Sequence, residues 1–351
     1  MKKKKRKKTI LTKNLIVTAF ILTLSLTGIM LINSKISAMD NHPHTNKSKA
    51  EGVSAADKQQ NPSVNSDENS SELDSYINSE EVSKEGYEAD NKLSEGSQHN
   101  KSTASEAETL LKEMENNIKN YMGADLNSLG FIYYDTSTGE KISINENKIF
   151  LAASTVKVQL NMIAYDWAEK GRLSLDDSIK YKESDNEDGT GILQNQDKSQ
   201  PFKIQELLDY SIIYSDNIAT NMLFRTLGGY KKVRSMVNKK FGINMDTSGN
   251  YITPQGEFTI LKYLYDNRTN SNYAHLIDVM KGTVFHDRID KYIPQDISAH
   301  KTGEYDYYVN DVGIIFTENP YILVVYTYNI ENAHEKIAEI SKMIYNYHIN
   351  K

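Results

Sequence analysis

Two residues near the middle of the chain have the types and the spacing that nucleophilic catalysis requires. Ser154 and Lys157 lie three positions apart in FLAASTVKVQL, near the start of a predicted helix, and this spacing puts both side chains on one face. A serine hydroxyl needs a base within hydrogen-bonding reach, and a lysine serves as that base only if its pKa is lowered. The start of a helix also offers unpaired N–H groups to a developing oxyanion. The pair alone is weakly specific, because Ser298 and Lys301 repeat the spacing.

Two more short motifs follow in the chain. Ser-Asp-Asn occurs at residues 184–186 and again at residues 215–217, and Lys-Thr-Gly occupies residues 301–303 on a predicted strand. In the order Ser-x-x-Lys, Ser-Asp-Asn, Lys-Thr-Gly they form the motif set of class A β-lactamases and penicillin-binding proteins. The chain from about Ser105 to Lys351 therefore resembles this superfamily of serine hydrolases, and the flanking stretches AEKGRLSLDDSIKY and YSDNIATNMLFRTLGG agree.

The resemblance separates the two Ser-Asp-Asn copies. The interval from Ser154 to Ser215 matches the family spacing, and an apolar helical run precedes Ser215. The interval from Ser154 to the first copy, at Ser184, is shorter than the family spacing. This copy also lies among charged residues, in what is expected to be a solvated loop without a scaffold. That loop also lacks the Asp and Gly spacing of a calcium site. The second copy is assigned to the site, and the first to coincidence.

The resemblance implies catalytic roles around the first two motifs. Ser154 is expected to be the acylated nucleophile and Lys157 its base. Ser215 is expected to relay a proton to the leaving nitrogen of the substrate. Asp216 would hold the loop, and Asn217 would bond the substrate's amide.

The Lys-Thr-Gly strand is expected to bind the substrate. By resemblance, Lys301 and Thr302 bind its carboxylate, Gly303 completes the motif, and the backbone N–H of Glu304 forms the oxyanion hole with that of Ser154. A second cation close to a lysine lowers its pKa. Lys301 should therefore lower the pKa of Lys157 to a value at which it can act as a base. No cofactor and no metal is expected.

One part of the family pattern is missing. Class A β-lactamases carry an omega-loop glutamate, in Glu-x-x-Leu-Asn, for the water that hydrolyses the acyl-enzyme. The acidic residues between Asn217 and Thr259 are Asp246 and Glu257, and neither begins that pattern. The loop is expected to be shortened to about NMDTSGN, with Glu257 as a solvated residue near a helix start and Asp246 as the one carboxylate that could substitute. Acylation by β-lactams should be fast and deacylation slow, since release needs an activated water.

These features predict an extracytoplasmic serine hydrolase acting on β-lactams. Two alternatives remain open: a D-Ala-D-Ala carboxypeptidase or penicillin-binding protein acting on peptidoglycan stem peptides, and a penicillin sensor that is acylated without turnover. A monomer is expected. The net charge of −6 argues against a nucleic-acid-binding surface. The absence of cysteine excludes disulfides and thiolate chemistry, and His42 and His44 alone make no metal site.

The N-terminal third predicts a membrane anchor and a tether. A basic run, KKKKRKK, precedes an uncharged stretch over residues 14–34, which is typical of a helix that leaves the rest of the chain outside the cytoplasmic membrane. The alternative is a signal peptide cleaved after Ala38, with Ile36 and Ala38 at positions −3 and −1 of the cleavage site. Residues 1–38 form this segment, and residues 39–104 are too polar to fold and are predicted to be a disordered tether.

The remainder, residues 105–351, predicts one catalytic domain. A helix starting at Ser105 and closing on Gly123 is followed by two strands with a Gly-containing turn, a helical block, three strands and a final amphipathic helix. The terminal parts of this domain must meet across the helical block to complete one sheet. The expected fold class is α+β: an antiparallel sheet flanked by the terminal helices, with an inserted all-helical subdomain.

Overall fold

The computed structural model describes residues 99–351. The predicted anchor, and the tether up to residue 98, lie outside the described residues. Among residues 99–351, no helix is both long enough and apolar enough to cross a membrane. The first described helix, α3 (His99–Met122), begins before Ser105, so the predicted helix start was wrong. Each residue added to an existing helix gains a hydrogen bond without a new nucleation cost, which lets the polar turn before Ser105 join the helix.

A five-stranded antiparallel sheet forms the centre of the domain, in the order β2-β1-β9-β8-β7. The first strand pairs with the last, so that Gly130 lies opposite Tyr326. The two ends of the folded chain therefore complete one sheet, as predicted. The strands are β1 (Leu129–Asp135), β2 (Lys141–Ile144), β7 (Ser298–Tyr305), β8 (Tyr308–Ile315) and β9 (Tyr321–Tyr328).

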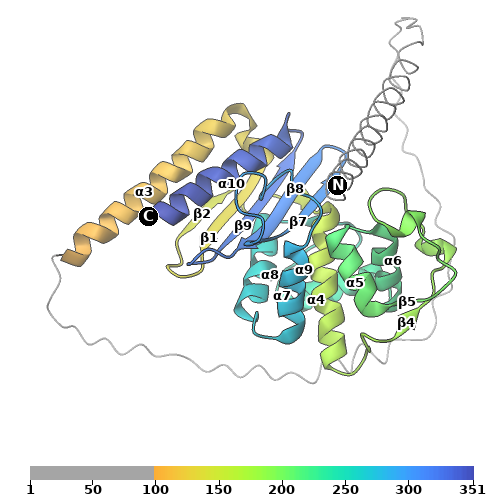
Figure 1. The fold of residues 1–351 in the computed structure, drawn as a ribbon. Coiled ribbons are helices and arrows are strands. Elements are labelled where there is room, and N and C mark those ends of the chain that lie inside the picture. Colours follow the sequence, from red (N-terminus) through yellow and green to blue (C-terminus); the bar gives the residue numbers. More distant parts are fainter. Residues whose placement is uncertain (1–98) are drawn as a thin grey trace, which may run out of the picture. The chain divides into compact units, whose positions relative to one another are not determined.

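Helices cover both faces of this sheet (Figure 1). Helix α3 and the C-terminal helix α10 (Ala333–Asn350) run side by side over one face. The helical block covers the other face, with α8 packed on β1 and β9. Its helices are α4 (Val156–Glu169), α5 (Ile204–Ile213), α6 (Asn217–Thr226), α7 (Tyr230–Phe241), α8 (Pro254–Asp266) and α9 (Ser271–Lys281).

The two faces bury separate cores, because successive side chains in a strand point to opposite sides. On β1, Phe131 and Tyr133 pack with residues of α3 and α10, whereas Ile132 between them packs with the helical block. The predicted α+β fold class, a sheet with terminal helices and an inserted helical subdomain, is thus confirmed.

Helix α9 is the one long element that the sequence patterns missed. Asn270 caps it by accepting hydrogen bonds from the backbone N–H groups of Asn272 and Tyr273, and Leu276 and Met280 are buried one turn apart. The asparagine cap and the apolar spacing were readable signals. The helix packs against α5 and β7, so it supports the strand that carries Lys-Thr-Gly.

Candidate active site

Ser154 lies in a tight turn between a short strand and a long helix. The turn is the 3-10 helix η2 (Ala153–Thr155), which follows β3 (Phe150–Leu151) and leads directly into α4. Ala153 has a φ of 51°, a left-handed conformation that a residue with a side chain adopts at a cost of about 1–3 kcal/mol. Asn250 holds this turn through two hydrogen bonds. Its side-chain Nδ2 donates to the Ala153 carbonyl at 2.9 Å, and its main-chain carbonyl accepts from Ala152 N at 2.8 Å. Ser154 itself is partly exposed, so a substrate can reach it.

Lys157 is buried one turn into the same structure, with only 3% of its surface exposed. Its Nζ donates to the Ser215 carbonyl at 2.7 Å and to Asn217 Oδ1 at 2.8 Å, and lies 3.2 Å from Ser215 Oγ. Burial lowers the pKa of Lys157 to about 7, although the carboxylates of Asp216 and Glu187 oppose the shift. A substantial fraction of this lysine is therefore neutral at physiological pH, as a general base must be.

Ser215 connects the two lysines of the sequence motifs, Lys157 and Lys301. Its Oγ lies 3.2 Å from Lys157 Nζ and 3.0 Å from Lys301 Nζ, and the serine is 3% exposed. Ser215 also has a left-handed backbone, with a φ of 50°, in the turn between α5 and α6. Burial, and then the positive charge of Lys157, hold the pKa of Lys301 well below its usual value. One hydroxyl thus bridges two amines, an arrangement that can pass a proton.

Asp216 and Asn217 bind the loop over residues 186–195. Asp216 caps α6 by accepting from Ala219 N at 2.9 Å, and its other oxygen accepts from Leu193 N at 2.8 Å. Asn217 Nδ2 donates to the Asp188 carbonyl at 2.9 Å. The loop approaches so closely that a Cβ on Gly191 would lie 2.4 Å from the Asp216 carboxylate. The loop over residues 186–195 is therefore fixed against the start of α6.

The first Ser-Asp-Asn copy has a structural role that the sequence prediction did not foresee. Asp185 is 2% exposed, and its two oxygens accept from Arg225 Nε at 2.8 Å and from the same guanidinium's NH2 at 2.7 Å. It also accepts from Lys182 N at 2.8 Å. The expectation of a loop without a scaffold was therefore wrong at this residue. A bidentate arginine partner on α6 makes burial of the carboxylate possible, whereas Ser184 and Asn186 are exposed.

Strand β7 runs directly beside η2, the turn that carries Ser154. A Cβ added to Gly303 would lie 2.6 Å from the Ala152 carbonyl oxygen and 3.1 Å from Ser154 N, so only glycine allows this approach. Thr302 is 5% exposed, and its carbonyl accepts from Lys301 Nζ at 2.9 Å. The predicted motif residues are thus brought together by β7, η2 and the α5–α6 turn.

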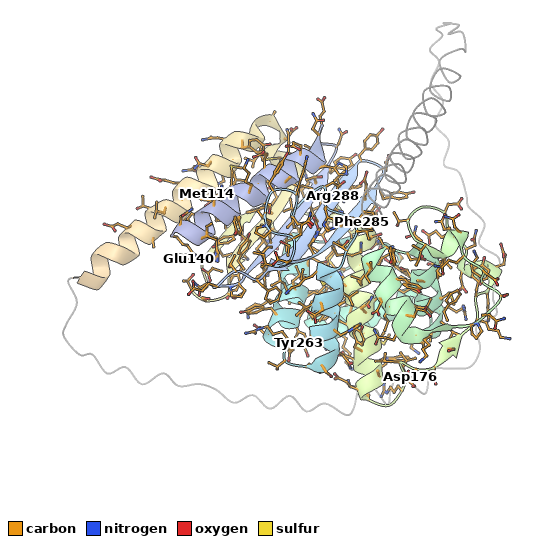
Figure 2. All side chains as sticks on the ribbon, in the orientation of Figure 1. Met114, Glu140, Asp176, Tyr263, Phe285 and Arg288 are labelled. Carbon is orange, nitrogen blue, oxygen red and sulfur yellow. The ribbon has the colours of Figure 1, made fainter. Side chains whose placement is uncertain are left out.

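Arg288 supports β7 and was missed by the sequence reading, since nothing in its neighbourhood marks it. Its guanidinium donates to the carbonyls of Gly303 at 3.3 Å and Asn310 at 3.0 Å, and forms an ion pair with the half-exposed Glu304 side chain. Figure 2 labels Arg288 and Phe285, and the Phe285 ring centroid lies 5.7 Å from Lys301 Nζ. Arg288 therefore fixes the segment of β7 that lies beside Ser154.

Glu257 is fully buried, so the expectation of a solvated residue was wrong. Its Oε2 accepts from Gln159 Nε2 at 3.0 Å and from the Tyr326 hydroxyl at 3.1 Å, and Oε1 has no partner. The same tyrosine hydroxyl lies 2.8 Å from Oγ1 of Thr155, the residue after Ser154. Burial raises the pKa of Glu257 to about 7, although these hydrogen bonds and Arg234 oppose the shift. Glu257, in the first turn of α8, is thus hydrogen-bonded to residues of α4 and β9, which no local sequence pattern predicts.

A first prediction concerns this buried carboxyl group. Between about pH 4.5 and pH 7 the folded protein keeps a proton on Glu257 that the unfolded chain has lost, so the free energy of unfolding should fall as pH rises. Glu257→Gln keeps an oxygen that accepts from Gln159 and Tyr326 but does not titrate. We expect it to remove up to about 3 kcal/mol of that pH dependence in urea unfolding at a series of pH values. Glu331→Gln, at an exposed position, is the matched control, and an unchanged pH profile for Glu257→Gln would contradict the raised pKa of this carboxyl group.

The loop after α7 brings an amide to the turn that carries Ser154. Asp246 is exposed, and its carboxylate accepts from Ser248 N at 2.9 Å and from the Ser248 hydroxyl, which lowers its pKa. Asn250, at the end of the loop, is the residue that contacts the turn through Ala153. Its Oδ1 is buried and makes no hydrogen bond within the described residues. Asn250 was not singled out from the sequence.

Comparisons with known proteins identify the family to which the chain belongs. A family model described as "Beta-lactamase enzyme family" matches residues 110–348. Beta-lactamase VEB-1 of Pseudomonas aeruginosa is 23% identical over 268 residues, which cover 67% of this chain and 90% of that enzyme. A beta-lactamase of Bacteroides uniformis is 24% identical over 274 residues, covering 67% and 91%.

Solved structures show the same fold. The TLA-1 extended spectrum beta-lactamase has a TM-score of 0.63 at 25% identity, covering 68% of this chain and 99% of its own. A mutant of PBP-A, solved as an acyl-enzyme complex with penicillin G, has a TM-score of 0.63 at 22% identity, covering 69% and 98%.

Proposed function

Because the chain belongs to the beta-lactamase enzyme family, we propose that it is a serine hydrolase acylated on Ser154 by β-lactams and slow to release the acyl group. The observation that carries the proposal is the position of Ser215 Oγ between Lys157 Nζ and Lys301 Nζ, at 3.2 and 3.0 Å. This arrangement provides a base of lowered pKa, a proton carrier and a fixed amine within one buried unit. The resemblance seen in the motifs is thus confirmed at the level of the family, which makes the chain a hydrolase.

In the proposed acylation step, neutral Lys157 accepts the proton of the Ser154 hydroxyl as its oxygen attacks the β-lactam carbonyl. The N–H groups of Ser154 and Glu304 stabilise the oxyanion. When the ring C–N bond breaks, Ser215 donates its proton to the leaving nitrogen and regains one from Lys157. Lys301 and Thr302 bind the substrate carboxylate, and Asn217 bonds its amide.

Slow deacylation follows from what the loop after α7 contributes. Hydrolysis of the acyl-enzyme needs a group that takes a proton from water. Asn250 is the loop residue that reaches the nucleophile turn, and an amide can orient a water but cannot accept its proton. The Asp246 carboxylate accepts a hydrogen bond from Ser248 N, and the Glu257 side chain is fully buried. The geometry therefore supports a stable acyl-enzyme.

The same feature favours a second candidate, a penicillin-binding peptidase acting on D-Ala-D-Ala stem peptides of peptidoglycan. A β-lactam acyl group would be retained there as a dead-end product. A penicillin sensor would share this retention but lack peptidase activity. All three functions place the domain outside the cytoplasmic membrane, attached through the uncharged stretch of residues 14–34 or released after its cleavage.

The proposal is tested by a nitrocefin time course on the purified full-length protein. We expect a burst of about one equivalent of opened ring followed by a rate near zero, because the acyl-enzyme accumulates. Ser154→Ala should give no burst. Sustained turnover of many equivalents would contradict slow deacylation, and a burst from Ser154→Ala would contradict the nucleophile. Release of D-Ala from a stem peptide would identify the peptidase.

A further inference from the structure

A cluster of two histidines and one aspartate lies behind the strand that carries the substrate lysine. His300 and Lys301 are neighbours in β7, so their side chains leave opposite faces of the sheet. His286, Asp290 and His300 each offer one ligand atom, and these atoms all lie within 4.8 Å of one another. The cluster is therefore separate from the proposed catalytic groups.

The spacing of these atoms is close to that of a metal centre. His286 Nδ1 lies 2.5 Å from Asp290 Oδ2, and His300 Nε2 lies 3.1 Å from the same oxygen. Two ligands that bind a tetrahedral zinc ion at their usual bond lengths lie about 3.3 Å apart. Small side-chain rotations would therefore bring all three ligand atoms to coordination distance.

Two buried atoms of the cluster have no hydrogen-bond partner in the described part of the chain. They are Asp290 Oδ1 and His300 Nε2, on residues that are 1% and 0% exposed. His300 Nε2 nevertheless forms an ion pair with Asp290 Oδ2 at 3.1 Å. Asp290 Oδ1 has no such partner, and leaving it unpaired inside a protein is costly, so this oxygen indicates an additional partner.

Asp311 orients His300 as a supporting carboxylate orients a metal ligand. Both of its oxygens lie 3.0 Å from His300 Nδ1, and Oδ2 also accepts from Ile289 N at 3.0 Å. A carboxylate on one ring nitrogen fixes the tautomer and leaves the other nitrogen for a metal. The negative charges of Asp290 and Asp311, both buried, would balance the charge of one divalent cation.

We propose that His286, Asp290 and His300 bind one zinc ion, with Asp311 as the orienting carboxylate. Two imidazole nitrogens and one carboxylate oxygen are a ligand set that suits zinc. The His286 side chain is 35% exposed, so the site opens to solvent and leaves the fourth position for a water. The ion ties β7 to the segment before it. Sequence spacing predicted no metal here, because the ligands come from a turn and a strand that only the fold brings together.

Cobalt and zinc titrations test this site on the chelator-treated full-length protein. His42 and His44 are replaced by alanine in the background, because they are histidines of the N-terminal segment that could also bind metal. We expect one equivalent of Co²⁺ with the visible absorption of a four-coordinate site, displaced by Zn²⁺, and a rise in Tm on zinc addition. His286→Ala and Asp290→Asn should weaken binding by more than the roughly 10–100-fold typical of a lost supporting residue.

The matched control is His275→Ala, which removes a half-exposed histidine that pairs with Asp209. It should bind metal as the background does. His286 is partly exposed, so its variant should fold, and circular dichroism checks this. Absence of stoichiometric binding, or equal binding by His286→Ala, would overturn the proposal and would identify the cluster as an internal ion pair. Neither result bears on acylation, because penicillin labelling is measured separately.

Discussion

Lys157→Met is expected to reduce the rate of acylation by penicillin about a thousandfold, within the range that general-base catalysis contributes. Methionine fills a similar volume but cannot accept the Ser154 proton. In the unmodified protein the acylation rate should rise with pH around 7, since burial lowers the pKa of this lysine to about 7. The variant should lose that rise. Stopped-flow labelling with a fluorescent penicillin measures both effects.

The same substitution should change the stability profile in a defined direction. The folded-state pKa of Lys157, about 7, lies below the ordinary 10.5, so the unfolded chain binds the extra proton between these values. The free energy of unfolding should therefore rise with pH in this window, and the rise should be smaller in Lys157→Met. Lys262→Met, which removes an exposed lysine paired with Asp266, is the control. Near-normal acylation by Lys157→Met would exclude this lysine as the base.

Gly303→Ala is expected to have an effect of similar size through the oxyanion hole. The added Cβ would lie 2.6 Å from the Ala152 carbonyl oxygen and 3.1 Å from Ser154 N. To relieve the clash, β7 and the turn that carries Ser154 must move apart, which displaces Ser154 N. Loss of one oxyanion donor costs about 10²–10³ in rate, and acylation should fall at least this far. Burst kinetics with nitrocefin provide the measurement.

Gly282→Ala is the matched control for this change. A Cβ there meets the nearest atom at 3.4 Å, an ordinary contact, so acylation should be unchanged. Thermal unfolding separates a local effect from a failure to fold. If folded Gly303→Ala acylates at the normal rate, β7 does not supply the oxyanion hole at this position.

The fold was predictable wherever one periodicity ran without interruption. The hairpin pattern marked β1 and β2, and the apolar 3-4 spacing marked α4 to α8. Helix α9 was missed because its Asn, Tyr and His residues are weak helix formers. The pairing of β1 with β9 could be inferred because isolated hairpins rarely bury enough apolar surface.

The site was predictable where short motifs fix both residue type and order. Burial of charged residues was not, because it depends on partners distant in sequence. Glu257 near a helix start looks solvated until Gln159 and Tyr326 are placed around it. Asp185 similarly depends on Arg225. Asn250 was also not recognised in any motif, and its contact with Ala153 joins residues that are distant in the sequence.

The most direct test of the account is the location and lifetime of the penicillin adduct. Full-length protein is treated with one pulse of penicillin, sampled over time, digested and analysed by mass spectrometry. We predict a stoichiometric adduct on the peptide that contains Ser154, still present after a time in which an enzyme of median kcat, about 10 per second, would complete thousands of turnovers. An adduct on another residue, or its loss within seconds, would contradict the account.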